Sequence, residues 1–66
     1  MTVREIGQLI KERRKVYNLS TIELADNAGV SLTLLKQVES GNRNPTLDSL
    51  NAILDVIGFE LNIEEK

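Results

Sequence analysis

The sequence predicts a mainly α domain of four helices followed by one β-strand at its C-terminal end. Two observations lead to this prediction. In four successive stretches the apolar residues recur every three or four positions, which is the period of one helix face. After residue 58 the period becomes two, which is typical of a half-buried strand. The chain has 66 residues, a length that favours one domain over several.

The first two helices are predicted on either side of a short break at residues 18–20. One face of the first helix carries Ile6, Leu9, Ile10, Arg13, Val16 and Tyr17. Asn18 should end this helix, because asparagine tolerates the left-handed backbone found at helix ends. Ser20 then forms a capping box with Glu23 and starts the second helix. This helix leads to Gly29, where the backbone can turn tightly.

The third and fourth helices are predicted from the residues that cap them. Ser31 is a good N-cap for the third helix, which runs to about residue 40. A polar loop follows, and Pro45 prevents it from continuing as helix. Thr46 caps the fourth helix, and Gly41 and Gly58 suit the positions just after the third and fourth helices. The apolar stripe of the fourth helix consists of Leu47, Leu50, Ile53, Leu54 and Ile57.

The strand is predicted over residues 59–64, where Phe59, Leu61 and Ile63 alternate with polar residues. One strand cannot satisfy its own backbone N–H and C=O groups, and no other segment of the sequence predicts a partner strand. We therefore expect the segment to pair with its two-fold mate in a homodimer, which would also enlarge the core of a small domain. A frayed tail and a strand docked on the chain's own helices are the alternatives.

The composition excludes several classes of function. The chain has no His and no Cys, so neither a disulfide nor a structural zinc site is expected, and the usual general base and thiol nucleophile of enzymes are missing. We expect no enzyme, no cofactor and no metal. The sequence has neither the apolar core of a signal peptide nor a run long enough to span a membrane, so a cytoplasmic protein is expected. The net charge of −2 argues, by itself, against a nucleic-acid partner.

Residues 21–38 nevertheless contain a helix-turn-helix pattern. Two short helices joined by residues 28–31 pack together if their contact residues are apolar and one residue at the crossing is small. Ala25 is that small residue, and Gly29 provides the turn. The apolar contact set is Leu24, Ala25, Ala28, Val30, Leu35 and Val38. A plain helical bundle is the alternative.

Over nearly its whole length the chain resembles the Xre/Cro family of helix-turn-helix repressors, which are lambda-repressor-like DNA-binding domains. The resemblance is carried by residues 6–15, Asn18-Leu19-Ser20, Glu23-Leu24-Ala25, Ala28-Gly29-Val30-Ser31, residues 39–45 and Leu47. The C-terminal segment is similar to that of HipB-like antitoxins, in which a strand pairs across the dimer. The resemblance implies a dimeric autorepressor that binds double-stranded DNA, with a HipA-like kinase toxin as a second partner. It implies a DNA-binding domain at residues 1–58 and a dimerisation strand and tail at residues 59–66.

In a helix-turn-helix protein the second helix of the motif lies in the major groove and contacts base edges. The residues expected to contact bases are Leu32, Thr33, Lys36 and Gln37. Gln37 can form a bidentate pair with adenine, whereas Leu32 can only contact a thymine methyl group or exclude water. Leu32 and Leu34 depart from the more polar surface that is common in the family. A solvated helix face is the alternative for all four residues.

Phosphates are expected at helix starts, where free N–H groups and the helix dipole favour anions, and in the loop after the third helix. The candidates are Ser20, Thr21, Ser31, Asn42, Arg43 and Asn44. Thr21 stands where the family usually has Gln, so it reaches less far toward a base. The resemblance also implies that Arg14 pairs with Glu39 and that a bidentate bond fixes the angle of the third helix. Two unrelated surface charges are the alternative.

The charge is divided unevenly along the chain. Residues 1–45 contain seven basic and five acidic side chains, while residues 46–66 contain one basic and five acidic side chains. The first part, at +2, can therefore approach DNA, while the second part, at −4, repels it. A two-fold dimer implies a palindromic operator with half-sites about 34 Å apart. Two other functions stay open: a stand-alone phage or chromosomal regulator without a toxin, and a protein-interaction adaptor that has lost DNA binding.

Overall fold

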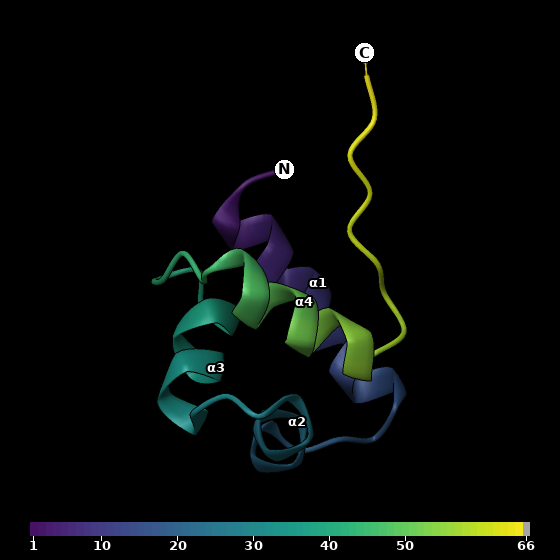
Figure 1. The fold of residues 1–66 in the computed structure, drawn as a ribbon. Coiled ribbons are helices and arrows are strands. Elements are labelled where there is room, and N and C mark those ends of the chain that lie inside the picture. Colours follow the sequence, from purple (N-terminus) through teal and green to yellow (C-terminus); the bar gives the residue numbers. More distant parts are fainter. Residues whose placement is uncertain (66) are drawn as a thin grey trace.

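A computed structural model describes residues 1–65, which contain four helices (Figure 1). The helices are α1 (Val3–Val16), α2 (Thr21–Ala28), α3 (Leu32–Glu39) and α4 (Leu47–Val56). The mainly α class and the four helices predicted from the sequence are confirmed. Among residues 1–65, none of the helices combines the length and the apolar character needed to cross a membrane.

The N-cap residue before each helix carries a hydroxyl group. The side-chain oxygens of Thr2, Ser20, Ser31 and Thr46 each accept a hydrogen bond from the backbone N–H three residues later. These bonds satisfy N–H groups that the first turn of a helix leaves free. The N-caps of α2, α3 and α4 agree with the sequence-based prediction, whereas the N-cap of α1 was not predicted. Thr2 and Glu5 form a complete capping box there, and its signal in the sequence is the Thr-x-x-Glu spacing before an apolar periodic stretch.

The breaks between the helices occur where the sequence predicts them. The residues with positive φ are Asn18, Gly29, Gly41 and Gly58. Gly29 is the C-cap of α2 with a φ of 70°, and its N–H donates to the carbonyl oxygen of Asp26 at 3.2 Å. This left-handed backbone is unfavourable for residues that carry a Cβ atom, which explains why glycine stands in the turn.

The hydrophobic core lies between the four helices. Its largest completely buried side chains are Ile10, Leu24, Leu35, Val38, Ile53 and Ile57. α1 packs against α3, and α2 packs against both α3 and α4. Every helix contributes apolar side chains to this core, so the motif formed by α2 and α3 is held against the other two helices. Four residues of the predicted apolar faces are exposed instead: Leu9, Val16, Tyr17 and Leu47.

Gly7 allows α1 to approach α3 very closely. A Cβ atom at residue 7 would overlap the carbonyl oxygen of Val38 and would lie 2.9 Å from the carbonyl oxygen of Glu39. Both oxygens belong to the backbone of α3, so they cannot move aside as a flexible side chain would. The absence of a side chain at residue 7 therefore sets the distance between the two helices.

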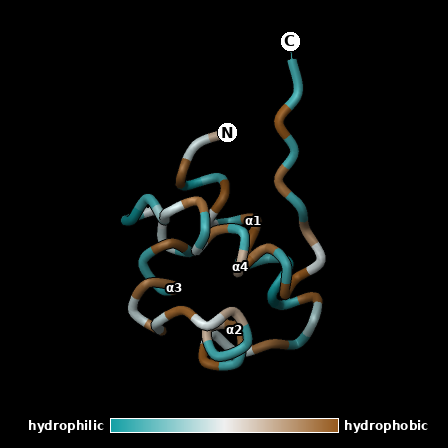
Figure 2. Tube along the Cα trace, in the orientation of Figure 1, coloured by the Kyte–Doolittle hydropathy of each residue, from teal (hydrophilic) through white to brown (hydrophobic). Residues whose placement is uncertain are grey.

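The strand predicted over residues 59–64 does not form in the described chain. Residues 59–65 continue past α4 as an extended segment in which apolar and polar residues alternate (Figures 1 and 2). A β-strand requires ladder hydrogen bonds to a second strand, and residues 1–65 of one chain supply no second strand. The segment is anchored at its start, where the Phe59 N–H donates to the Leu54 carbonyl oxygen at 2.9 Å. Residue 66, the last of the predicted tail, lies outside the described residues.

Candidate nucleic-acid interface

The helix-turn-helix unit consists of α2, the turn at residues 29–31, and α3. Ala25 is 3% exposed in the core, as expected for the small residue at the helix crossing. The Val30 N–H donates to the Ala25 carbonyl oxygen at 3.1 Å and closes the turn. The Ser31 hydroxyl oxygen then accepts from the Leu34 N–H at 3.0 Å and starts α3. Local hydrogen bonds thus set where α3 begins relative to α2.

The outer face of α3 carries three of the four residues predicted to contact bases. Thr33, Lys36 and Gln37 are exposed, whereas Leu35 and Val38 on the opposite face are completely buried. α3 therefore presents hydroxyl, ammonium and amide groups to a partner, which are groups that can bond to base edges and phosphates.

Leu32, the fourth predicted base contact, is half-buried and packs against the hydrophobic core. Leu34, the other apolar departure from the family, has the same environment. Part of each side chain is therefore used for packing inside the domain. The surface of Leu32 that is available to a thymine methyl group is therefore smaller than the four-residue set predicts.

The loop after α3 folds back onto the end of that helix. The Asn42 N–H donates to the Gln37 carbonyl oxygen at 2.9 Å, and the Ser40 hydroxyl donates to the same oxygen at 3.0 Å. Arg43 Nη1 donates to Gln37 Oε1 at 3.0 Å. The sequence predicts that Gln37 contacts a base and that Arg43 contacts a phosphate. It does not predict the hydrogen bond between the two side chains. The two residues are six positions apart and the end of α3 lies between them, so no helical periodicity indicates that they meet.

The other candidate phosphate contacts lie at the starts of α2 and α3 and in this loop. Ser20, Asn42 and Asn44 are exposed, and Thr21 is half-buried. The hydroxyl oxygens of Ser20 and Ser31 already accept bonds as helix caps, but each hydroxyl proton can still be donated to a phosphate oxygen. The predicted phosphate contacts thus keep donor groups at two helix N-termini.

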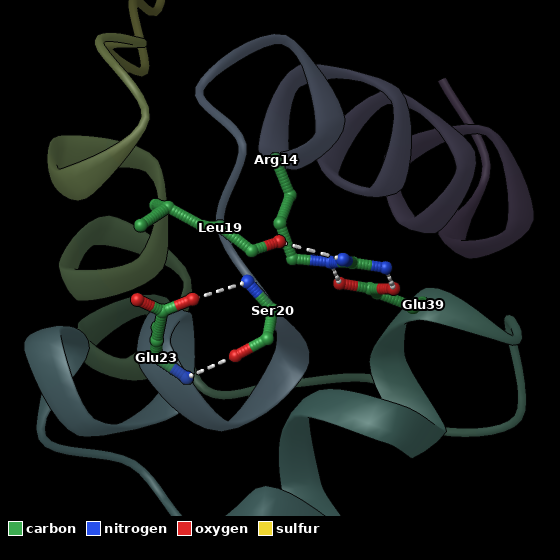
Figure 3. Close-up of polar contacts among 5 residues, drawn as sticks. All are labelled: Arg14, Leu19, Ser20, Glu23 and Glu39. Carbon is green, nitrogen blue, oxygen red and sulfur yellow. Dashed lines mark hydrogen bonds and ion pairs between the residues drawn. The ribbon is translucent and has the colours of Figure 1, made fainter.

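The capping box of α2 places a carboxylate beside these donors (Figure 3). The Ser20 N–H donates to Glu23 Oε1 at 2.9 Å, and the Glu23 N–H donates to Ser20 Oγ at 3.0 Å. The bond from the Ser20 N–H, with a smaller contribution from the Ser20 hydroxyl, lowers the pKa of Glu23 below its usual value. The Ser20 N–H is therefore used within the protein. A phosphate at this helix start would bond to the N–H groups of the next two residues, which have no partner within the helix.

Arg14 and Glu39 form a bidentate ion pair between α1 and the end of α3 (Figure 3). Arg14 Nε donates to Glu39 Oε2 at 2.8 Å, and Arg14 Nη2 donates to Glu39 Oε1 at 3.1 Å. The side chains are only 11% and 7% exposed. Arg14 Nη1 also donates to the carbonyl oxygen of Leu19 at 2.9 Å, a contact that the sequence did not indicate. One guanidinium group thus joins α1, the segment before α2, and the C-terminal end of α3.

Comparison with known proteins adds a family assignment to this geometry. The helix-turn-helix family model matches residues 10–63. The ImmF control region 10 kDa protein of Bacillus phage phi105 is 35% identical over 60 residues, which cover 91% of this chain and 67% of that protein.

Two further relatives are named repressors. The cryptic phage CTXphi transcriptional repressor RstR of Vibrio cholerae is 36% identical over 61 residues, which cover 92% of this chain and 53% of RstR. The immunity repressor protein of Bacillus phage phi105 is 34% identical over 56 residues, which cover 85% of this chain and 39% of that protein. The match thus spans about half of the first repressor and a smaller part of the second.

Proposed function

Because this chain belongs to the helix-turn-helix family, we propose that it is a transcriptional repressor that binds double-stranded DNA through α3. The observation that carries the proposal is the outer face of α3, where Thr33, Lys36 and Gln37 are exposed on a helix whose opposite face is completely buried. A helix held in this way can enter the major groove without losing its packing.

The direction of regulation is proposed from the relatives. Two of them are named as a transcriptional repressor and an immunity repressor of phages. We therefore place the stand-alone phage or chromosomal regulator first. The antitoxin of a HipA-like kinase is a second candidate, and its support is the similarity of residues 59–63 to HipB-like tails. A kinase reading frame beside the gene, together with co-purification of the kinase, would favour the second candidate.

The proposed repressor is a homodimer that binds a palindromic operator. Residues 59–65 support a dimer, because they form an extended segment without a ladder partner in the described chain. Leu61 is 42% exposed and Ile63 is 97% exposed. Beside the segment lies an apolar groove of about 400 Å³, to which Leu9, Leu54 and Phe59 contribute. Pairing with the same segment of a second chain would satisfy the backbone groups and cover apolar surface.

A mobility-shift titration on the DNA upstream of the gene tests the proposed function. The full chain should shift this DNA at low salt, and the affinity should fall steeply between 50 and about 200 mM salt if Lys36, Arg43 and other cations contact phosphates. The matched variant is Lys36→Ala, which should reduce both the affinity and the salt dependence.

Two results would argue against the proposal. Absence of binding to any duplex, with the protein folded, would favour an adaptor that contacts other proteins. A palindrome bound no more tightly than a single half-site would contradict the dimeric part. We further propose that the protein has no catalytic activity of its own, in line with the lack of His and Cys in the sequence.

A further inference from the structure

The bond between Arg43 and Gln37 constrains how the Gln37 amide can be oriented. Arg43 Nη1 lies 3.0 Å from Gln37 Oε1. A guanidinium group has donors and no acceptor, so the oxygen of the amide must face Arg43 and the nitrogen must point elsewhere. Without this bond, the exposed amide of Gln37 could rotate between two orientations of similar shape.

The backbone around Arg43 supports this contact. The Asn42 N–H and the Ser40 hydroxyl both donate to the Gln37 carbonyl oxygen, at 2.9 Å and 3.0 Å. The Asn42 side-chain nitrogen also donates to the Ser40 hydroxyl oxygen at 3.1 Å. The segment that carries Arg43 is therefore bonded to the same residue whose side chain Arg43 contacts. This arrangement holds the arginine beside the outer face of α3.

We propose that Arg43 is a specificity-determining positioning residue, which orients the Gln37 amide for adenine and connects this base contact to the DNA backbone. The proposal rests on the proposed function of α3 in the major groove. A bidentate pair with adenine needs the amide nitrogen to donate to N7 and the amide oxygen to accept from the N6 amino group. Because a carbonyl oxygen has two lone pairs, Gln37 Oε1 can accept from Arg43 and from adenine at the same time.

Arg43 also keeps donors that the Gln37 contact does not use. A guanidinium group carries five N–H donors, and the bond to Gln37 occupies one of them. The remaining donors can bond to a phosphate of the strand that borders the groove. A phosphate bond would hold Arg43 in place, and Arg43 would in turn hold the amide of Gln37. Base preference at one position would thereby depend on a residue that does not touch the base.

Selection of binding sites from randomised duplex DNA tests this proposal. The full-length protein is compared with Gln37→Ala, Arg43→Ala and the double variant. The wild type should prefer adenine at one position of each half-site, and a bidentate contact discriminates by roughly tenfold to a hundredfold. Gln37→Ala should abolish this preference. Arg43→Ala should reduce it by about tenfold, while the preferences at other positions change little.

A double-mutant cycle separates positioning from a simple charge contact. On the preferred site, the double variant should lose affinity by a smaller factor than the product of the factors for the two single variants, because both variants remove the same oriented contact. On a site with another base in place of this adenine, the factor by which the double variant loses affinity should equal the product of the two single factors. Lys11→Ala is the matched control, since it removes one exposed positive charge from α1 and should weaken every site by the same factor.

The possible outcomes distinguish this inference from the proposed function. If Arg43→Ala weakens all sites equally, as Lys11→Ala does, Arg43 is an ordinary phosphate contact and the inference is wrong. A wild-type preference for a base other than adenine at the position lost in Gln37→Ala would also overturn it. If the folded wild type enriches no sequence at all, the proposed function itself is wrong. Thermal melting of each variant by circular dichroism verifies that it is folded, and both side chains are exposed.

Discussion

At the scale of single residues, the most constrained polar group is the Arg14 guanidinium. It donates two bonds to the Glu39 carboxylate and one to the Leu19 carbonyl oxygen, and Arg14 is only 9% exposed. A charge in such a position is tolerated because its donors are bonded, and removal of its partner leaves it buried and uncompensated. We therefore expect the pair to affect both the stability of the domain and the orientation of α3 through the same contacts.

Glu39→Ala should lower the free energy of unfolding by about 3 kcal/mol, because it leaves Arg14 buried without its counter-charge. Urea denaturation measures this loss, with Glu12→Ala, which removes an exposed carboxylate from α1, as the control.

The effects of Arg14→Ala and Glu39→Ala on DNA affinity should not be additive. Strict additivity would mean that the pair does not set the angle of α3.

The capping-box carboxylates predict a specific dependence of stability on pH. The N–H groups and hydroxyls of Thr2 and Ser20 lower the pKa values of Glu5 and Glu23 from the usual 4.5. A carboxyl group whose pKa is lower in the folded state stabilises the protein above its unfolded pKa, and this stabilisation is lost as the pH falls through the folded pKa.

The double variant Glu5→Gln, Glu23→Gln should therefore melt at a lower temperature than the wild type at pH 7. As the pH is lowered from 7 through the folded pKa values of Glu5 and Glu23, the wild-type carboxyl groups become protonated too, and the two melting temperatures should converge. Glutamine can still accept the backbone bond of a capping box, so the comparison isolates the charge. A difference in melting temperature that stays constant over this range would contradict the prediction.

At the scale of the elements, the contact between α1 and α3 depends on the missing side chain of Gly7. The neighbouring atoms are backbone carbonyl oxygens of Val38 and Glu39, which belong to the last turn of α3. Any group added at residue 7 would push α3 away from α1 at the end that also carries the Arg14 contact to Glu39. Helix separation and the ion pair are therefore coupled at one place.

Gly7→Ala should destabilise the domain by about 1–3 kcal/mol through overpacking. Helix propensity alone predicts the opposite sign, since alanine favours a helix interior by about 1 kcal/mol over glycine. Gln8→Ala on the exposed side of α1 is the control, and its change should stay within about 0.5 kcal/mol. Chemical denaturation of both variants decides between packing and propensity.

At the scale of the whole molecule, basic and acidic side chains are distributed unevenly along the chain. The net charge of −2 divides into +2 over residues 1–45, which contain α3 and its loop, and −4 over residues 46–66. Exposed apolar side chains occur in both parts, with Val16 and Ile22 in the first and Leu61 and Ile63 in the second. The parts of the chain that carry the proposed DNA-binding and dimerisation surfaces thus differ in the sign of their net charge.

The full-length double variant Leu61→Asp, Ile63→Asp should be monomeric in sedimentation experiments at concentrations where the wild type is a dimer. It should also lose the preference for a palindrome over a single half-site. Both residues alternate with Asn62, so Asn62→Asp is a control that adds charge to the same segment on the other face. The variant keeps Phe59, whose N–H bond to Leu54 anchors the segment. An unchanged dimer would remove residues 59–64 from the interface.

By itself, the sequence determined the four helices, the caps of α2, α3 and α4, and most of the apolar residues that form the core, although Val16 and Leu47 of the predicted faces are exposed. These features depend on groups three or four residues apart, such as Ser20 and Glu23, so residues that are close in the sequence are enough to predict them. The same reasoning missed Thr2 as a cap although its spacing to Glu5 is the same. For the tail, alternation indicated an extended chain, but a strand also needs a partner that one chain does not supply.

Only the tertiary structure decided how the candidate site is held together. The overlap that a side chain at Gly7 would have with α3, the Arg14 bond to Leu19, and the Arg43 bond to Gln37 depend on where separate segments lie in space. The residues of the proposed interface could be named from their pattern, except that packing withdrew part of Leu32 from the surface. Periodicity specifies which face of a helix is buried, whereas contacts across helix ends are set by packing and turn geometry.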